Sequence, residues 1–260
     1  MKLIYLALAT LLVTACQPAE DNAAHTTEAN AQEYPSYFKE VLDAHGGLEK
    51  WKQFGSMQYQ ITKKGETETH LIDLKNRKDL VKADKYTIGY DGHQVWVSPN
   101  KAAFPDQSAT FYHNLYFYFH AMPFVLADPG VNYEKLDTIS VQGKTYNVIG
   151  ISFGSGVGET PEDQYQLFID PATNRMAWLL YTITYFDKKQ SDEFKALKFE
   201  DYKENQGLLF PTKLTSYKYE NGQIGDLRYG FTFDGLALKK EQPDQAQFEK
   251  PENAEVDSGE

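Results

Sequence analysis

Short segments in which apolar and polar residues alternate, separated by turn residues, dominate the chain between residues 57 and 233. A period of two places the apolar side chains on one face of a β-strand. The clearest pair, Tyr86–Tyr90 and Gln94–Val97, flanks Asp91-Gly92, which is a strong hairpin signal. Strands joined by short turns predict an antiparallel meander rather than β-α-β units. The other predicted strands are Met57–Ile61, Thr69–Asp73, Tyr146–Phe153, Asp163–Ile169, Met176–Phe186, Ala196–Tyr202, Leu214–Tyr219 and Leu227–Phe233.

Aromatic residues supply the apolar surface that such a sheet must bury. The chain has 18 Tyr, 16 Phe and 3 Trp, together 14% of its residues, and aromatic side chains favour strands. Its single cysteine, Cys16, excludes an internal disulfide, so the fold depends on its packed core. Residues 34–250 have the length of one large all-β domain. Residues 251–260 are mostly polar, and we expect them to be disordered.

Two segments depart from the strand pattern. Residues 34–54 carry apolar residues at three- and four-residue steps, interrupted at Gly46-Gly47, and predict a helix with a break. Residues 104–133 are apolar around the whole helical wheel, which implies burial on nearly all sides. Pro123 and Pro129-Gly130 divide and end this stretch, which predicts one or two short helices. We expect an insertion this apolar to cover an open face of the sheet, or a ligand in it.

The first 16 residues have the layout of a bacterial secretory signal. Lys2 precedes a short apolar run, residues 3–12, which is too short to cross a bilayer as a helix. The ending Val13-Thr14-Ala15-Cys16 resembles the lipobox of bacterial lipoproteins, in which the cysteine thiol receives diacylglycerol. This predicts a signal peptide at 1–15, a membrane anchor at acylated Cys16 and a flexible polar tether at 16–33. Gln17 in place of Asp resembles the sorting signal for the outer membrane of Gram-negative bacteria, and we expect the domain to face the periplasm.

The acidic balance of the chain argues against nucleic acid as a partner. The formal net charge is −11, and loss of Lys2 with the signal peptide makes the mature chain slightly more acidic. No stripe of Lys and Arg is visible that would neutralise a phosphate backbone.

Four motifs occur in a characteristic order along the chain: Tyr90–Val97, Leu167–Thr173, Gly207–Leu214 and Pro243–Phe248. In this order they resemble the LolA/LolB-like superfamily of periplasmic carriers. The resemblance implies an N-terminal helix and a curved antiparallel half-barrel whose concave apolar face is capped by helices and binds an acyl chain, a lipoprotein or another apolar molecule. Residues 44–51 and 112–131 look like an uncharacterised domain-of-unknown-function family of Bacteroidota lipoproteins, which implies no chemistry.

Two patterns typical of hydrolases are present but lack the expected surroundings. Gly150-Ile151-Ser152-Phe153-Gly154 fits G-x-S-x-G, yet a glycine-rich stretch follows Ser152 where a nucleophile elbow needs a helix. Acidic residues at 159, 162 and 163 are expected to form a solvated turn, since a glycosidase needs two carboxylates that converge in one cleft. We therefore predict no catalytic residue and no enzyme activity.

The histidines do not form a metal-binding pattern. His113 and His120 are seven residues apart, whereas pairs of metal ligands on a helix are usually three or four apart, and no Glu-x-x-His accompanies them. We predict neither a metal nor another cofactor. His45, which precedes Gly46-Gly47, is expected to cap the first helix.

These observations predict a mainly β protein with three functional hypotheses. The first is an outer-membrane-anchored lipoprotein that binds a lipid, acyl chain or other apolar ligand in the half-barrel, with lipid or lipoprotein as cargo. The second is a structural or partner-binding envelope lipoprotein with a filled core. The third is an envelope hydrolase that uses carboxylates or Ser152. The residues predicted to line the ligand site of the first are Trp96, Phe111, Tyr116, Phe119, Phe124, Trp178 and Tyr181.

Overall fold

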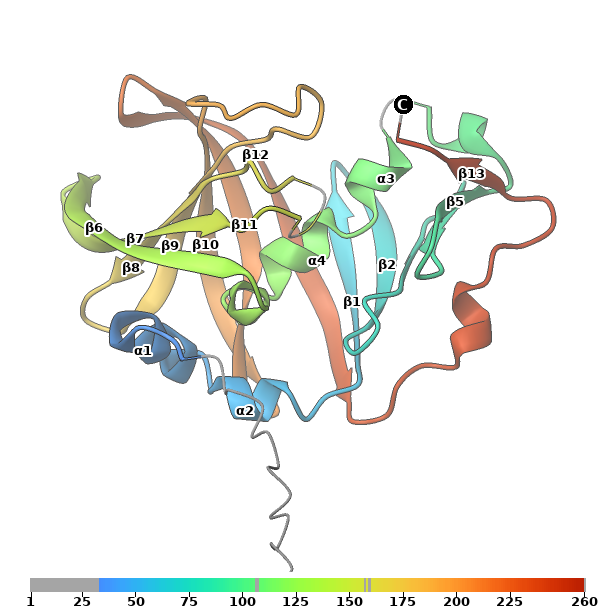
Figure 1. Ribbon diagram of the computed structural model, residues 1–260, viewed down its shortest axis with the longest axis horizontal. Coiled ribbons are helices and arrows are strands. Elements are labelled where there is room, and N and C mark those ends of the chain that lie inside the picture. Colours follow the sequence, from blue (N-terminus) through green and yellow to red (C-terminus); the bar gives the residue numbers. More distant parts are fainter. Residues whose placement is uncertain (1–32, 106–107, 157, 159, 260) are drawn as a thin grey trace, which may run out of the picture. The chain divides into compact units, whose positions relative to one another are not determined.

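The computed structural model describes residues 33–259 except 106–107, 157 and 159. Residues from Tyr34 onward form one compact unit (Figure 1). The predictions for the signal peptide, for Cys16 and for the tether up to residue 32 lie outside the described residues. Among the residues described, no helix combines the length and the apolar character needed to cross a bilayer.

A single antiparallel sheet of 13 strands forms the body of the molecule, which confirms the predicted mainly β fold. Its order is β13-β5-β4-β3-β2-β1-β12-β11-β10-β9-β8-β7-β6, so two meanders, β1–β5 and β6–β12, are joined where β1 pairs with β12. The strands are β1 Ser56–Lys63, β2 Glu66–Asp73, β3 Asp79–Lys82, β4 Thr87–Tyr90, β5 Val95–Ser98, β6 Val131–Val141, β7 Lys144–Phe153, β8 Tyr165–Asp170, β9 Arg175–Tyr181, β10 Lys195–Asn205, β11 Leu208–Glu220, β12 Gln223–Lys239 and β13 Glu255–Asp257.

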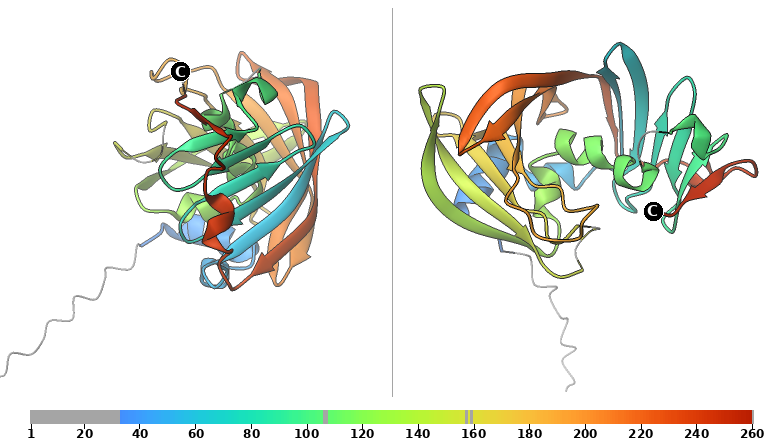
Figure 2. Two further views of the ribbon diagram at one scale, coloured as in Figure 1. Left: turned by 90° about the vertical axis from the view of Figure 1, so that its right-hand side faces the viewer. Right: turned by 90° about the horizontal axis from the view of Figure 1, so that it is seen from above.

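The strand order determines the path of the aromatic insertion. Strands β5 and β6 follow one another in the chain, yet β6 is one edge of the sheet and β5 lies next to the other edge. The connection must therefore cross the hollow of the curved sheet, and Figure 2 shows it doing so, seen from above. Residues 108–128 of this connection are called the cap below. The connection contains η1 Lys101–Ala103, α3 Ala109–Tyr112, α4 Leu115–His120 and η2 Phe124–Ala127. The last three lie within residues 104–133, where one or two short helices were predicted.

The N-terminal helix is divided at the predicted glycine pair. Helix α1, Ser36–Ala44, ends at His45, whose Nδ1 lies 2.8 Å from the Val41 carbonyl oxygen, which confirms the predicted capping role. Helix α2, Leu48–Trp51, follows the break. The Leu209 amide donates to the His45 carbonyl at 2.9 Å, so this corner is fastened to β11.

Gly46 lies where the backbone of this corner meets β11. Its φ is +106°, and a Cβ atom would overlap the carbonyl oxygen of Gly207. We expect Gly46→Ala to lower the free energy of unfolding by about 3 kcal/mol or more, because strain and a backbone clash add. Gly47→Ala is the control: its φ is +92°, but nothing lies within 4 Å of its Cβ position, so we expect a loss of only about 1–2 kcal/mol. Urea denaturation measures both, and equal losses would contradict the role of the close approach.

The predicted disorder of residues 251–260 is wrong for residues 255–257. This segment forms β13, which pairs with β5 (Figure 2, left). Strand β5 would otherwise expose unpaired backbone groups, and even a polar segment can satisfy these. Before it, η3 Gln245–Phe248 inserts Phe248 against Leu80 and Trp96.

Candidate functional site

The concave face of the sheet is apolar and is covered by the cap. Inward-facing residues of the strands and aromatic residues of the cap form one buried cluster. Within the cap, Phe117 is 2% exposed and Phe124 is 1% exposed. Phe124 stacks on Trp51 of α2 at a ring distance of 5.1 Å and contacts Phe210 of β11. The cap thus fills the hollow with its own side chains. The other buried cap residues of this cluster are Phe119, Ala121, Met122, Val125, Leu126 and Ala127.

Four of the predicted ligand-site residues meet in this cluster. Phe119 contacts Tyr181 of β9 at 5.1 Å between ring centroids, Tyr116 contacts Phe231 of β12 at the same distance, and Phe124 lies deeper. Phe111 is half-buried at the other end of the cap. It contacts Tyr185 and Phe186, which belong to the loop after β9 and not to the concave face.

Trp96 and Trp178 do not line the concave face, and their predicted position is wrong. Trp96 packs against Phe248 on the opposite face and donates to its carbonyl at 3.0 Å, while Val95 and Val97 face the cap.

Trp178 belongs to a separate cluster with Phe168 and Leu180, whereas its neighbour Leu179 faces inward. The reason is the period of two. Trp178 and Tyr181 are an odd number of residues apart in one strand and cannot face the same side.

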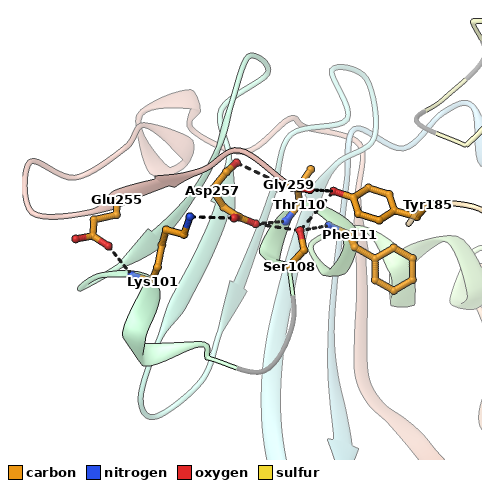
Figure 3. Close-up of polar contacts among 8 residues, drawn as sticks. All are labelled: Lys101, Ser108, Thr110, Phe111, Tyr185, Glu255, Asp257 and Gly259. Atoms are coloured by element: carbon orange, nitrogen blue, oxygen red, sulfur yellow. Dashed lines mark hydrogen bonds and ion pairs between the residues drawn. The ribbon is translucent and has the colours of Figure 1, made fainter. Parts of the chain in front are cut away.

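The C-terminal strand fastens the α3 end of the cap (Figure 3). A carboxylate oxygen of Asp257 accepts hydrogen bonds from the Thr110 amide at 2.8 Å and from the Ser108 hydroxyl at 3.1 Å. Lys101 lies 3.6 Å from the other oxygen, and the Thr110 hydroxyl donates to the Asp257 carbonyl. Burial alone would raise the pKa of Asp257, but these hydrogen bonds outweigh it and hold the pKa below its usual value.

The other end of the cap is fastened by an ion pair and two hydroxyl groups. Arg77, in the turn after β2, donates to both carboxylate oxygens of Asp128 at 2.8 and 2.6 Å. Tyr34 donates to the Ala127 carbonyl at 2.8 Å, and Tyr133 donates to the Leu126 carbonyl at 2.5 Å. Polar contacts therefore hold both ends of a segment that contributes no strand to the sheet.

Between these ends, the cap covers a group of polar side chains on β1–β3. We call Tyr59, Lys63, Glu68, His70 and Asp79 the polar patch; all of them except Lys63 are buried. Lys63 lies 3.0 Å from Glu68, and His70 Nε2 lies 3.2 Å from the same carboxylate. Burial alone would raise the pKa of Glu68, but hydrogen bonds from His70 and Tyr86 and the charge of Lys63 hold it below its usual value.

The cap supplies matching groups to the polar patch. The hydroxyl of Tyr112 donates to Glu68 at 2.7 Å, and Nδ1 of His113 lies 2.6 Å from Asp79. His120 stacks on Phe233 at 3.9 Å and contacts Tyr59 edge-on. Burial, together with the nearby His70, lowers the pKa of His120 to about 3, so its ring is neutral at pH 7.

Sequence patterns missed the polar patch because its members share no local motif. In the sequence, His70 looks like an ordinary residue of a strand. Glu68 is one acidic residue among polar neighbours, so neither indicates a site. A partial signal was available: Tyr59, Ile61 and Lys63 have the same parity in β1, as do Glu68, His70 and Ile72 in β2. Both sets therefore face the same side of the sheet.

The hydrolase patterns have other structural roles. Ser152 is an exposed residue of β7, paired with Asn132, and is not in a strand-to-helix turn. The expected solvated acidic turn is wrong for Asp163, which is buried and accepts hydrogen bonds from the amide and the hydroxyl of Thr184, both at 2.8 Å. In the part of the chain that the structure describes, no three His, Cys, Asp or Glu residues are grouped so as to hold a metal ion.

An open groove of about 740 Å³ lies between residues 192–195 and the turn of the β11–β12 hairpin. Charged side chains such as Glu193, Lys218 and Arg228 alternate in its lining with Phe194 and Tyr219. A lining of this mixed character offers no continuous apolar surface.

Comparison with known proteins identifies one matching protein family. The profile of the "Family of unknown function (DUF6503)" matches residues 49–223, which include the cap and the polar patch. No curated protein matches the chain. Similar solved structures include a LolA superfamily protein from Nitrosomonas europaea, at 11% identity over 81% of this chain and 96% of that chain, with a TM-score of 0.48. A DUF1329 family protein from Desulfovibrio piger has 13% identity, the same coverage and a TM-score of 0.48.

Proposed function

We propose that this chain, which belongs to the DUF6503 family of unknown function, is a lipid-anchored envelope protein that binds an apolar ligand on the concave face of its sheet when the cap is displaced. The observation that carries the proposal is which part of the chain fills the concave face. The concave face is covered by aromatic side chains of a segment that pairs with no strand and is held at both ends by polar contacts. Such a segment occupies the place of an acyl chain and can exchange with one.

The anchor and the location are part of the same proposal. The lipobox-like ending at Cys16 and the polar tether favour attachment to the outer membrane, with the domain facing the periplasm. The ligand is a lipid, an acyl chain or the acyl part of a lipoprotein. Binding would be driven by apolar burial at about 25 cal/mol per Å² and would need neither a catalytic residue nor a cofactor.

Release of the cap provides the test. Asp257→Ala removes the hydrogen bonds that Asp257 accepts from Ser108 and Thr110. It should destabilise the closed position of the cap, relative to the open one, by about 1 kcal/mol. If ligand binds only the cap-open state, this raises the apparent affinity for the apolar dye N-phenylnaphthylamine about fivefold. Val256→Ala, in the same strand but 42% exposed, is the matched control and should bind as the wild type does.

The filled core also supports the second candidate, a structural or partner-binding lipoprotein. Under that function, neither the wild type nor Asp257→Ala takes up the dye. Organic extraction of protein purified from its own envelope would then yield no lipid in repeated preparations. These two results together would replace the ligand-binding proposal.

A further inference from the structure

The concave face is apolar along β7–β11 but carries the polar patch along β1–β3. Burying two carboxylates in a core is costly unless each is paired. Glu68 and Asp79 are nevertheless only 3% and 1% exposed. The face below the cap is thus amphiphilic, with a large apolar part and a compact polar part at one side.

The cap supplies hydrogen-bond donors to both carboxylates through adjacent residues, although Oδ1 of Asp79 stays buried without a partner among the described residues. Tyr112 donates to Glu68 and His113 donates to Asp79, because each carboxylate accepts from the group that approaches it. When the cap is displaced, both donors leave together. Glu68 then keeps Lys63, His70 and Tyr86 as partners, and the side chain of Lys63 is 22% exposed. Asp79 loses the donor that His113 provides.

The patch also holds polar atoms that the cap does not satisfy. Within the part of the chain that the structure describes, the hydroxyl of Tyr59, Nδ1 of His70 and Oδ1 of Asp79 are buried without a hydrogen-bond partner. Burial, together with the carboxylates of Asp79 and Glu68, raises the pKa of Tyr59, so its hydroxyl keeps its proton. Tyr59 therefore offers a hydrogen bond that a ligand could accept.

A head group that fits must donate to the carboxylates and accept from Tyr59. A hydroxyl group does both, and a polyol presents several at once. A carboxylate or phosphate head donates nothing to Glu68 and Asp79 and would be repelled by them. A pure hydrocarbon would leave both carboxylates without the donors that the cap provides.

We infer that the ligand is an amphiphile with a neutral, hydroxyl-bearing head group, such as an acylglycerol or a glycolipid, whose head occupies the polar patch while its chain lies along β7–β11. This inference rests on the proposed function, because the patch becomes available only when the cap is displaced. It adds the chemical class of the ligand.

Isothermal titration calorimetry at pH 7.5 with two ligands of equal chain length tests it. Monomyristin and myristate share their hydrocarbon chain and differ in the head group. We expect the wild type to bind monomyristin about tenfold or more tightly than myristate, because sites built to hydrogen-bond a hydroxyl discriminate strongly. Equal affinities, or tighter binding of myristate, would overturn the inference.

Variants connect the selectivity to the patch. Glu68→Gln removes the negative charge and one acceptor, so the preference for monomyristin should fall toward parity. Glu200→Gln is the matched control, because Glu200 pairs with Lys198 and Thr215 on the other face. If Glu68→Gln does not fold, Asp79→Asn takes its place. A preference that persists in the patch variant would contradict the inference.

Different results would contradict the head-group inference and the proposed binding function. If the wild type binds N-phenylnaphthylamine but does not prefer monomyristin, the head-group inference is wrong and the binding function stands. If neither the dye nor either amphiphile binds, the proposed function is wrong and the inference falls with it.

Discussion

Between pH 7 and pH 5 the protein is expected to lose about 4 kcal/mol of its free energy of unfolding, because two buried histidines stay neutral in the folded state. Burial lowers the pKa of His45 to about 4 and that of His120 to about 3. The unfolded chain takes up protons near pH 6.5, so acid favours unfolding. The stabilisation is complete above pH 6.5 and decreases as the pH falls toward 4 and 3. At pH 5 each histidine accounts for about 2 kcal/mol.

Between pH 7 and pH 5 the effect of the histidines can be measured with little contribution from the carboxylates. Glu68, Asp73 and Asp257 have lowered pKa values, so their contribution is complete above the ordinary carboxylate pKa of about 4 and is lost as the pH falls from there through the lowered values. Urea denaturation at pH 7 and pH 5 therefore measures mainly the histidine effect.

A single substitution should halve this pH dependence. His120→Phe keeps a ring against Phe233 but cannot be protonated, so the loss between pH 7 and pH 5 should fall to about 2 kcal/mol. His93→Gln changes an exposed histidine in the β4–β5 turn and should leave the loss unchanged. An undiminished loss in His120→Phe would show that His120 is not a source of the acid sensitivity.

Phe124→Ala should lower the free energy of unfolding by about 3–5 kcal/mol, because it opens a cavity between the cap and the sheet. Phe124 is 1% exposed and packs against Trp51 and Phe210, which belong to different elements and cannot both move into the space. Urea denaturation at pH 7 should show a lower midpoint with an unchanged slope.

Phe111→Ala is the control for Phe124→Ala, since it makes the same substitution at the half-buried end of the cap. We expect a loss below about 2 kcal/mol there. If Phe124→Ala costs no more than Phe111→Ala, the cap does not pack tightly on the concave face. The same cavity should admit the apolar dye at lower concentration than in the wild type, which connects this stability measurement with the proposed function.

Local signals in the sequence predicted most of the sheet. Hairpins such as β4–β5 need only alternation and a turn dipeptide, both of which are encoded within a dozen residues. Strands β3, β6 and β13 were missed. Strands β6 and β13 are the two edges of the sheet, and an edge strand exposes polar side chains that hide the alternation.

The site was less predictable because its contacts are long-range. Glu68 and Tyr112 are 44 residues apart, and Asp79 and His113 are 34 apart. Nothing in the neighbourhood of either carboxylate indicates burial, because burial of a charge depends on partners that arrive from other elements. Trp96 was misplaced for a related reason, since the sequence shows that a side chain is apolar but not which of two apolar faces it covers. For Trp178 and Tyr181 the period of two excludes a shared face, but it does not show which of the two faces inward.

By itself the sequence determined most of the strands and their turns, the glycine break between α1 and α2, and the apolar character of the cap, because each depends on residues close together in the chain. Only the tertiary structure decided that the cap lies in the hollow and that its Tyr112 and His113 meet two buried carboxylates. The physical reason is topological: pairing of β1 with β12 places β5 and β6 near opposite edges of one sheet, so the segment between them has to cross its concave face.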